Sequence, residues 1–318
     1  MFEIIKSGTQ FDFVRRRHLF AGVSLALVLL TFVLFFTKGL NYGIDFTGGA
    51  EVQLHVPTTW DIGKLRSELE TGGVPSAKVQ QIGLPEESQY LVRAQGDDQS
   101  LSRVSQTIEA VLSKTLKEGE FEILRTSVVG PAAGESLRTS GFLSMLYALV
   151  CILIYVTVRF DARYSPGAVL ALFHDTVITM GVFILTQKPF DLQILAAILA
   201  LIGYSNNDTI IVYDRVRETL LLNPKLSIEE SVNRAINETL GRTILTSMTT
   251  FLTVLALWAF GGKVIEDFAF TLMVGIIVGT YSSMFIASSV VIWMTHYYAR
   301  KEASASAKAG GSVGSAVV

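Results

Sequence analysis

Long apolar runs separated by short polar segments follow one another along most of this chain. Six of them reach roughly 18 residues or more, which is the length a helix needs to cross a bilayer. These runs cover residues 19–36, 141–158, 166–186, 192–213, 243–260 and 268–296. The pattern predicts a polytopic α-helical membrane protein with six transmembrane helices.

The stretch between the first two apolar runs, residues 37–138, has the pattern of a soluble domain. Alternating positions predict strands, the 3.6-residue period predicts helices, and their order is β-α-β-β-α-β, as in an α+β ferredoxin-like domain. The strands are expected at 51–56, 78–82, 89–94 and 121–129, and the helices at 58–70 and 101–112. Thr58 or Thr59 is the expected N-cap of the first helix. The domain has no cysteine and no histidine pair, which favours a binding or coupling module over an enzyme.

The remaining segments complete the domain plan. Residues 1–18 form a short N-terminal segment, and residues 139–298 hold the other five spans. Within these, a capping box at Ser227 and Glu230 opens a predicted amphipathic helix at about 227–241. Its apolar face would lie in the membrane interface or against another helix. The tail, 299–318, is rich in Ala, Ser and Gly, and we expect it to be disordered.

Composition and charge agree with this plan and orient it. The mean hydropathy is +0.46, and half of the residues are hydrophobic. Basic residues gather before the first run, in the loops after the second and fourth runs, and after the last run. By the positive-inside rule both termini are cytoplasmic and the 37–138 domain is periplasmic. The first run is longer than a signal-peptide core and lacks a small-residue cleavage site, so it reads as a retained anchor.

Four consecutive polar residues, Ser205 to Asp208, interrupt the fourth apolar run. A helix-centre Asp costs roughly 2.5–3.5 kcal/mol on insertion scales, so such residues face the bundle interior and mark ion or proton paths. Burial favours the protonated form of a carboxyl, and a nearby cation favours the charged form. Arg242 opens the fifth span and can reach toward Asp208. Asp208 can therefore load and release a proton if this cation approaches and withdraws.

The third apolar run holds a second ionisable pair, His174-Asp175, near its middle. The pair is either a second relay station or a group that hydrogen-bonds the bundle, and the residues leave both interpretations open. The same holds for Asp208 and Arg242, which are either a proton relay or a structural ion pair. Cys151 stands alone, so no intrachain disulfide is possible.

Several long motifs of this chain resemble those of the SecF family, the smaller half of the bacterial SecDF accessory complex of the Sec translocase. They are Gly43–Gly49, Val129-Gly130-Pro131, His174-Asp175, Ile202–Ile210, Asp214–Glu218 and Arg242–Ser247. The resemblance covers nearly the whole chain except the tail. It implies membership of the resistance-nodulation-division superfamily, whose halves have six spans and a large external domain between spans one and two.

The resemblance also implies a function. It implies a multi-pass inner-membrane subunit that pairs with SecD and uses the proton motive force to promote late steps of preprotein export. Implied partners are SecYEG, SecA, YajC, YidC and an unfolded preprotein at the periplasmic face, without nucleic acid. Asp208 would bind the proton, Arg242 would be its switching partner, and Asn207 would line the route with possible support from His174 and Asp175. The family's other essential acid would lie in SecD.

No cofactor, metal site or catalytic residue is expected, and the coupling ion is H⁺, with Na⁺ as an open alternative. A competing hypothesis is a small-solute or lipid exporter of the same superfamily. Such exporters commonly carry two six-span halves and larger external domains. A third hypothesis is a scaffold whose intramembrane charges only hold helices together.

Overall fold

The computed structural model describes residues 10–74, 77–82, 87–95, 101, 103–117 and 119–311. The chain forms two compact units. One unit is a helical bundle made of Met1–Leu40, Met145–Lys188 and Gln193–Val318. The other contains the sheet domain, Asn41–Ser144, together with the short segment Pro189–Leu192.

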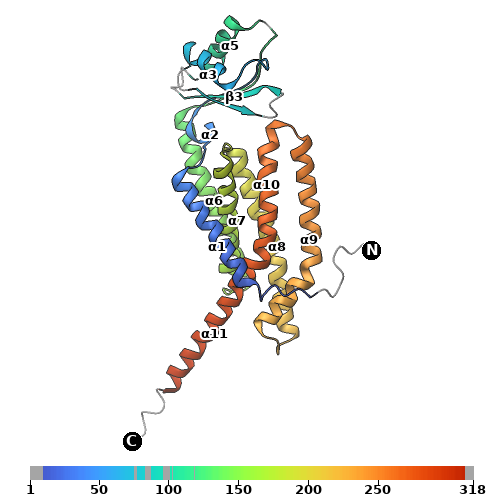
Figure 1. Cartoon of the computed structure of the whole chain (residues 1–318). Helices are drawn as coiled ribbons and strands as arrows, with labels where there is room; N and C mark the ends of the chain where they lie inside the picture. The colour runs from blue at the N-terminus through green and yellow to red at the C-terminus, as the bar shows by residue number, and fades with distance from the viewer. Residues whose placement is uncertain are drawn as a thin grey trace. The chain divides into compact units, whose positions relative to one another are not determined.

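The helices of the bundle are long and nearly uninterrupted (Figure 1). They are α1 (Arg17–Thr37), α6 (Pro131–Arg159), α7 (Ser165–Thr186), α8 (Leu192–Leu222), α9 (Ile228–Phe260) and a last helix made of α10 (Lys263–Ser282), a π-helical turn (Ser283–Ala287) and α11 (Ser288–Gly311). Within the described residues, six helices are long and apolar enough to cross a membrane. The predicted six-span fold class is confirmed.

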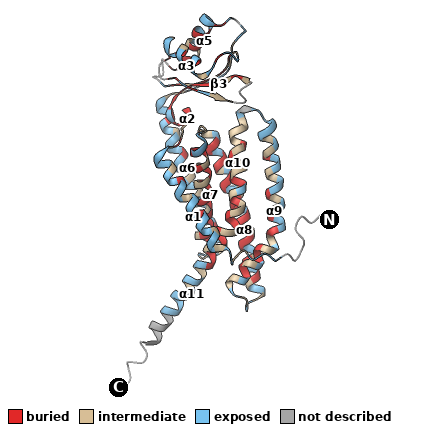
Figure 2. Cartoon of the chain, in the orientation of Figure 1, coloured by how far each residue is buried: buried red, intermediate tan, exposed pale blue. Residues whose placement is uncertain are grey.

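Burial divides the bundle into a centre and an outside (Figure 2). Helices α7 and α8 carry many buried residues along their length. Helices α1, α6 and α9 instead expose large apolar side chains, including Leu25, Ile154 and Leu252. An exterior as apolar as the interior is stable only where lipid is the solvent. The buried polar residues of α7 and α8, among them Asp175, Ser205 and Asp208, are therefore removed from both water and lipid.

The segment predicted as a separate amphipathic helix is part of a longer one. The capping box is confirmed: Ser227 accepts a hydrogen bond from the backbone of Glu230, whose side chain accepts from the backbone of Ser227. From there α9 runs without a break to Phe260, because no proline interrupts it and a single glycine is tolerated. Its first apolar face, with Val232 and Ile236, packs in the bundle beside residues of α8. The apolar face was expected either in the membrane interface or against another helix, and it packs against another helix.

The tail also differs from expectation. Helix α11 continues to Gly311, so the expected disorder from residue 299 does not hold for this part, and residues 312–318 lie outside the described residues. Ala is the commonest residue of the extension and has the highest helix propensity. Because α11 already supplies a nucleus, each further residue needs only the smaller propagation step.

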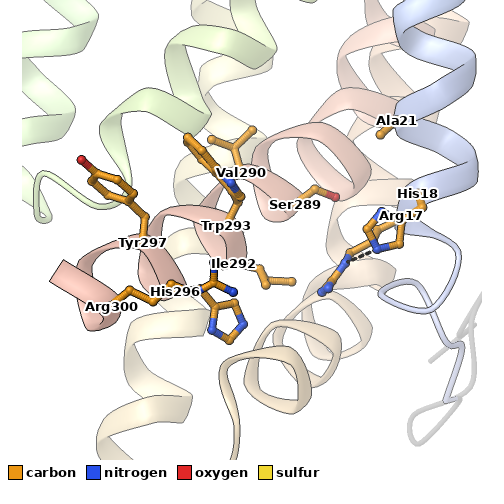
Figure 3. A pocket seen from close by; sticks show the side chains of 10 residues that line it. All are labelled: Arg17, His18, Ala21, Ser289, Val290, Ile292, Trp293, His296, Tyr297 and Arg300. Carbon is orange, nitrogen blue, oxygen red and sulfur yellow. Dashed lines mark hydrogen bonds between the residues drawn. The ribbon is translucent and has the colours of Figure 1, made fainter. Parts of the chain in front are cut away.

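A cavity of about 370 Å³ lies between the start of α1 and α11 (Figure 3). The lining side chains of α11 come from the turns after the π-helical segment. Arg17 and His18 from α1 face them across the cavity. Basic and aromatic side chains thus meet at one end of the bundle.

The second unit is a four-stranded antiparallel sheet with two helices. Its elements are α2 (Ile44–Thr47), β1 (Gly49–His55), α3 (Ile62–Thr71), β2 (Lys78–Ile82), β3 (Gln89–Ala94), α5 (Val104–Thr115) and β4 (Glu122–Val129). The strand order is β2-β3-β1-β4, which is the ferredoxin-like arrangement. The predicted β-α-β-β-α-β domain is confirmed, with strand bounds within a few residues of those expected.

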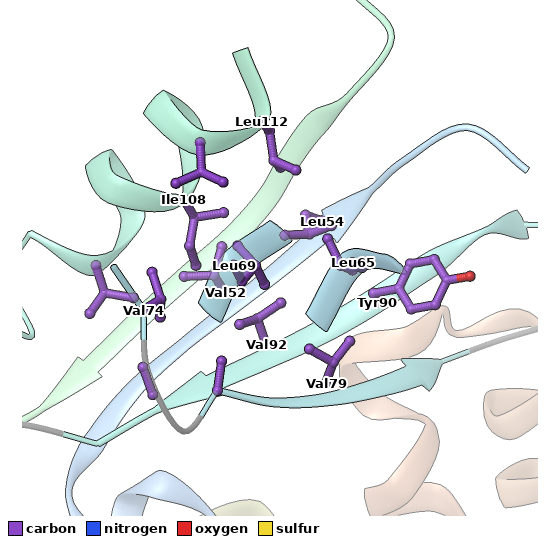
Figure 4. Close-up of a cluster of buried hydrophobic side chains, with 14 of the residues drawn as sticks. Val52, Leu54, Leu65, Leu69, Val74, Val79, Tyr90, Val92, Ile108 and Leu112 are labelled. Carbon is purple, nitrogen blue, oxygen red and sulfur yellow. The ribbon is translucent and has the colours of Figure 1, made fainter. Parts of the chain in front are cut away.

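The core of this domain lies between one face of the sheet and its two helices (Figure 4). Val52, Leu54 and Val92 point from the sheet toward α3 and α5, and the buried cluster includes Leu65 and Ile108. The start of α3 differs from the prediction. Asp61, instead of Thr58 or Thr59, is the N-cap, and its carboxylate accepts a 2.7 Å hydrogen bond from the backbone of Lys64. A carboxylate at this position also complements the helix dipole.

Candidate functional site in the helical bundle

Asp175 lies at the centre of the bundle and is held by three side chains. It is 1% exposed. Its Oδ2 atom accepts hydrogen bonds from Ser205 Oγ of α8 at 2.6 Å and from Ser282 Oγ of α10 at 2.8 Å. Its Oδ1 atom lies 2.9 Å from Nδ1 of His174. Three helices thus converge on one carboxylate, which ties them together.

His174 extends this cluster toward α1. Its ring is buried, and Nε2 has no hydrogen-bond partner among the described residues. The ring centroid lies 6.0 Å from that of Tyr281. The Tyr281 hydroxyl donates to the backbone carbonyl of Phe20 at 2.8 Å and lies 2.8 Å from Ser24 Oγ. Ring packing of His174 on Tyr281, and the hydrogen bonds of the Tyr281 hydroxyl, therefore connect the buried pair to the first span.

Asp208 is equally buried but much less supported. It is 2% exposed. Among the described residues its carboxylate accepts one hydrogen bond, from Ser247 Oγ of α9 at 3.4 Å. Ser247 in turn accepts a 2.8 Å hydrogen bond from Thr280 of α10. A bond of 3.4 Å between hydroxyl and carboxylate is long, because charge-assisted bonds of this kind are typically about 2.5–2.7 Å. Most acceptor sites of the Asp208 carboxylate therefore have no hydrogen-bond partner among the described residues.

The two carboxylates belong to one polar band. Ser205 and Asp208 stand about one turn apart on α8, and Thr280 and Ser282 of α10 are two residues apart and point to Ser247 and Asp175, respectively. Gly279 allows α10 to approach: a Cβ atom there would lie 3.0 Å from Cβ and Oγ of Ser205. Hydroxyl groups can both donate and accept hydrogen bonds, so they can pass protons between acids. Each acid therefore has hydroxyl groups of a neighbouring helix in its first contact layer: Ser205 and Ser282 at Asp175, and Ser247 at Asp208.

Two of the predicted site residues lie elsewhere. Asn207 and Arg242 are exposed, and no ion pair joins Arg242 to Asp208 among the described residues. The expected approach of the guanidinium to the carboxylate is therefore absent in this structure. The buried amide on this stretch is Asn206, whose Oδ1 atom has no partner among the described residues. Consecutive residues of a helix are about 100° apart, so Asn207 does not share the face on which Asp208 lies, and its side of α8 is the exposed one.

Sequence reasoning missed the hydroxyl groups that contact the carboxylates. Ser247, Thr280 and Ser282 stood in apolar runs, where Ser and Thr commonly bond their own helix backbone. A signal was present. Thr243 and Ser247 are four residues apart and therefore share a face of α9, and Thr280, Ser282 and Ser283 gather near the middle of the last run.

The start of α8 is fixed by the segment around the glycine pair Gly48-Gly49. Asp45 accepts a 3.0 Å hydrogen bond from the backbone of Leu192, the first residue of α8. Gly43 donates to the carbonyl of Phe190 at 2.7 Å, and the rings of Phe46 and Phe190 stack at 5.6 Å. Gly48 has a φ of 70° and lies against Pro131, where a side chain would clash. An acidic side chain thus caps the helix that carries Asp208.

Comparisons with known proteins place these features in one family. A family profile described as "Protein export membrane protein SecD/SecF, C-terminal" matches residues 107–297, which include both buried carboxylates. A second, described as "SecD/SecF GG Motif", matches residues 33–56 and so includes the segment that caps α8. The first match covers more than half of the chain. The chain belongs to the SecF family of protein translocase subunits.

Individual relatives extend this SecF match over nearly the full length. "Protein translocase subunit SecF" of Calditerrivibrio nitroreducens is 46% identical over 292 residues, covering 91% of this chain and 95% of the relative. The protein of the same name from Pseudomonas aeruginosa is 41% identical over 290 residues, covering 91% and 93%.

A crystal structure of SecDF from Thermus thermophilus, described as a translocon-associated membrane protein, has the same fold. It superposes with a TM-score of 0.83 at 37% identity. The match covers 91% of this chain but 39% of the SecDF chain. The SecF-family chain therefore spans well under half of that longer protein.

Proposed function

We propose that this chain is the SecF-type half of a SecDF-type complex and that Asp208 binds and releases the proton that drives its work. The observation that carries the proposal is the contrast at Asp208: the carboxyl is 2% exposed, yet a single 3.4 Å hydrogen bond supports it. A buried charge without close partners is costly, so such a group readily takes a proton. A proton crossing about 100 mV gains roughly 2.3 kcal/mol, enough for a few protons to drive a domain motion.

The exposure of two predicted site residues fits a function that needs a partner subunit with a second set of spans. Asn207 on α8 and Arg242 on α9 are exposed, although both belong to membrane-spanning helices. Polar and charged groups in spans face a protein interior or a water-filled path in preference to lipid. A SecD-type partner would cover them and place its own acid near Arg242. The guanidinium would then switch between that acid and Asp208.

The wider assignment follows from the same family. We propose a multi-pass protein of the bacterial inner membrane, with both termini cytoplasmic and the ferredoxin-like domain periplasmic. It would promote late steps of preprotein export beside SecYEG and SecA, with YajC and YidC as further neighbours. The relatives are named as protein translocase subunits, which favours this role over a small-solute or lipid exporter and over an enzyme. His174 and Asp175 would support the relay by holding α7, α8 and α10 in place.

The test measures preprotein export into vesicles that contain the complex with its SecD-type half and the translocon. Asp208→Asn should abolish the stimulation by a proton gradient while the protein remains inserted. Asp214→Asn is the matched control, since Asp214 lies on the same helix, is exposed and pairs with Arg159 at 3.7 Å; it should behave like the wild type. Varying pH and Na⁺ separately identifies the coupling ion. Undiminished proton-dependent export in Asp208→Asn would refute the role.

A further inference from the structure

The cavity between α1 and α11 is a built basic pocket whose residues take no part in the polar band around Asp175 and Asp208. Its volume is about 370 Å³. Two arginines, two histidines and two large aromatic side chains dominate the lining: Arg17, His18, Trp293, His296, Tyr297 and Arg300 (Figure 3). None of these side chains contacts either buried carboxylate. The pocket therefore needs an explanation of its own.

The charge of this pocket is positive. Its lining contains two guanidinium groups and no acid. One carboxylate reaches it from the first turn of α9: Glu229 Oε1 lies 3.6 Å from Arg17 Nη1 and 2.8 Å from His296 Nε2. Arg300 has no ion pair among the described residues, and Arg17 Nη1 is a buried atom without a hydrogen-bond partner there. Glu229 thus balances one positive charge and leaves donors available for an anion.

The position of the pocket identifies the kind of anion. Arg17 is the first residue of the first span, and Arg300 lies near the end of the last, so six crossings bring both to the same side of the membrane. Trp293 and Tyr297 are 64% and 50% exposed and stack at 6.0 Å. Exposed Trp and Tyr are typical of the level at which headgroups meet acyl chains. A ligand there has an apolar part beside the aromatic rings and an anionic part beside the arginines.

We propose that this pocket binds the phosphate headgroup of an anionic phospholipid, with Arg17 and Arg300 as its charged contacts and Trp293 and Tyr297 beside its acyl chains. Basic pockets at the ends of spans hold such headgroups. A bound lipid would bridge the first and last helices of the bundle. It would fasten α1, the span that leads into the sheet domain, to the end of α11.

The experiment is native mass spectrometry of the delipidated full-length protein, titrated with phosphatidylglycerol or with phosphatidylcholine. The wild type should retain one phosphatidylglycerol in preference to phosphatidylcholine. Each basic group near an anionic surface contributes enough for about a 5-fold change in affinity, so Arg17→Gln/Arg300→Gln should weaken phosphatidylglycerol binding by about 30-fold. A titration with inorganic phosphate tests for a site that takes free anions.

The matched control is Arg16→Gln/Lys301→Gln. It removes the same charge from the adjacent positions, which are exposed and do not line the cavity. This variant should bind phosphatidylglycerol within about 2-fold of the wild type, and its melting temperature checks the fold of both double variants. If phosphatidylglycerol binding weakened equally in the two double variants, the effect would come from general surface charge, and the proposed lipid site would be overturned. Equal retention of phosphatidylcholine, or displacement of the lipid by inorganic phosphate at matched concentration, would also overturn it.

Discussion

Asp175 and Asp208 are two carboxylates of nearly equal burial in one bundle, and their surroundings differ. Asp175 accepts from two serines within 2.8 Å and lies 2.9 Å from His174 Nδ1, so α7, α8 and α10 all contribute. Asp208 receives one 3.4 Å bond from α9. Burial alone therefore does not tell a structural acid from a working one. The number and length of the bonds to each carboxylate separate them.

The two acids differ in how much hydrogen bonding each would lose when its carboxylate is protonated. Protonating Asp175 would break or weaken three short bonds at once, because a neutral carboxyl accepts hydrogen bonds less strongly than a carboxylate. Protonating Asp208 would disturb one long bond. A relay residue has to change its charge many times without loosening the fold. The surroundings of Asp208 fit this proposed role, and those of Asp175 fit a fixed junction between helices.

The largest effect is expected from removing the junction. Asp175→Ala leaves the hydroxyls of Ser205 and Ser282 without their acceptor, and it should lower the free energy of unfolding by about 3–5 kcal/mol. Asp175→Asn keeps an acceptor and should lose about half as much. Unfolding in mixed micelles at increasing denaturing detergent measures both. A loss at Asp175→Ala no larger than at Asp208→Ala would remove the distinction between the two acids.

A smaller effect is expected from the close approach of α10 to α8. Gly279→Ala places a Cβ atom 3.0 Å from Ser205, and the required shift should lower the free energy of unfolding by about 1–3 kcal/mol. Gly203→Ala is the matched control on α8, since nothing lies within 4 Å of its Cβ position. The control should be neutral or stabilising by up to about 1 kcal/mol. The same unfolding assay compares them, and equal losses would contradict the geometry.

The two serines give a finer comparison. Ser205→Ala removes a 2.6 Å bond to Asp175 and should cost about 1.5 kcal/mol of unfolding free energy. Ser247→Ala removes the 3.4 Å bond to Asp208 and the 2.8 Å bond from Thr280, whose hydroxyl keeps its bond to the Ile276 carbonyl, and should cost about 1 kcal/mol. Both are buried Ser→Ala exchanges in spanning helices, which makes them controls for each other. If Ser247→Ala proved the more damaging, Asp208 would be the better-supported acid.

The smallest change in stability is expected at the residue with the largest proposed role. Asp208→Asn replaces a poorly supported carboxyl by a neutral amide of the same shape, so only one long hydrogen bond is at stake and the free energy of unfolding should change by about 0.5 kcal/mol or less. Unfolding and proton-dependent export are measured on the same preparation. A loss of several kcal/mol would instead identify Asp208 as structural, and export would then report only misfolding.

Hydropathy predicted the number of spans well and their ends less well. Helix α6 begins ten residues before the predicted span, at Pro131, and α8 continues nine residues beyond its span, to Leu222. Hydropathy measures the length of chain that lipid can solvate, and a helix continues past it wherever its backbone bonds remain satisfied. The strands of the ferredoxin-like domain were easier to predict. Their apolar and polar positions alternate, and turn residues separate them, so both the strand bounds and their order along the chain can be read from the sequence.

The site was predictable in its acids and not in their partners. The high cost of a carboxyl in a span predicted that Asp175 and Asp208 face inward. The roles of Asn207 and Arg242 depended on helix rotation and on the neighbouring helix, which an apolar run does not specify. The serines that contact the two acids could not be predicted for another reason. A Ser or Thr hydroxyl in a span can donate its hydrogen bond to a carbonyl of its own helix, so the sequence does not show which partner it takes.

The most direct test of the central claim is to observe the proton itself. Infrared absorption of protonated carboxyl groups is followed across a pH titration of the complex in lipid, for the wild type, Asp208→Asn and Asp175→Asn. The account predicts that one pH-dependent carboxyl component of the wild-type spectrum, resolved by comparing the wild type with each variant, is missing in Asp208→Asn and retained in Asp175→Asn. A band that persists in Asp208→Asn and disappears in Asp175→Asn would contradict it and assign the proton to the other acid.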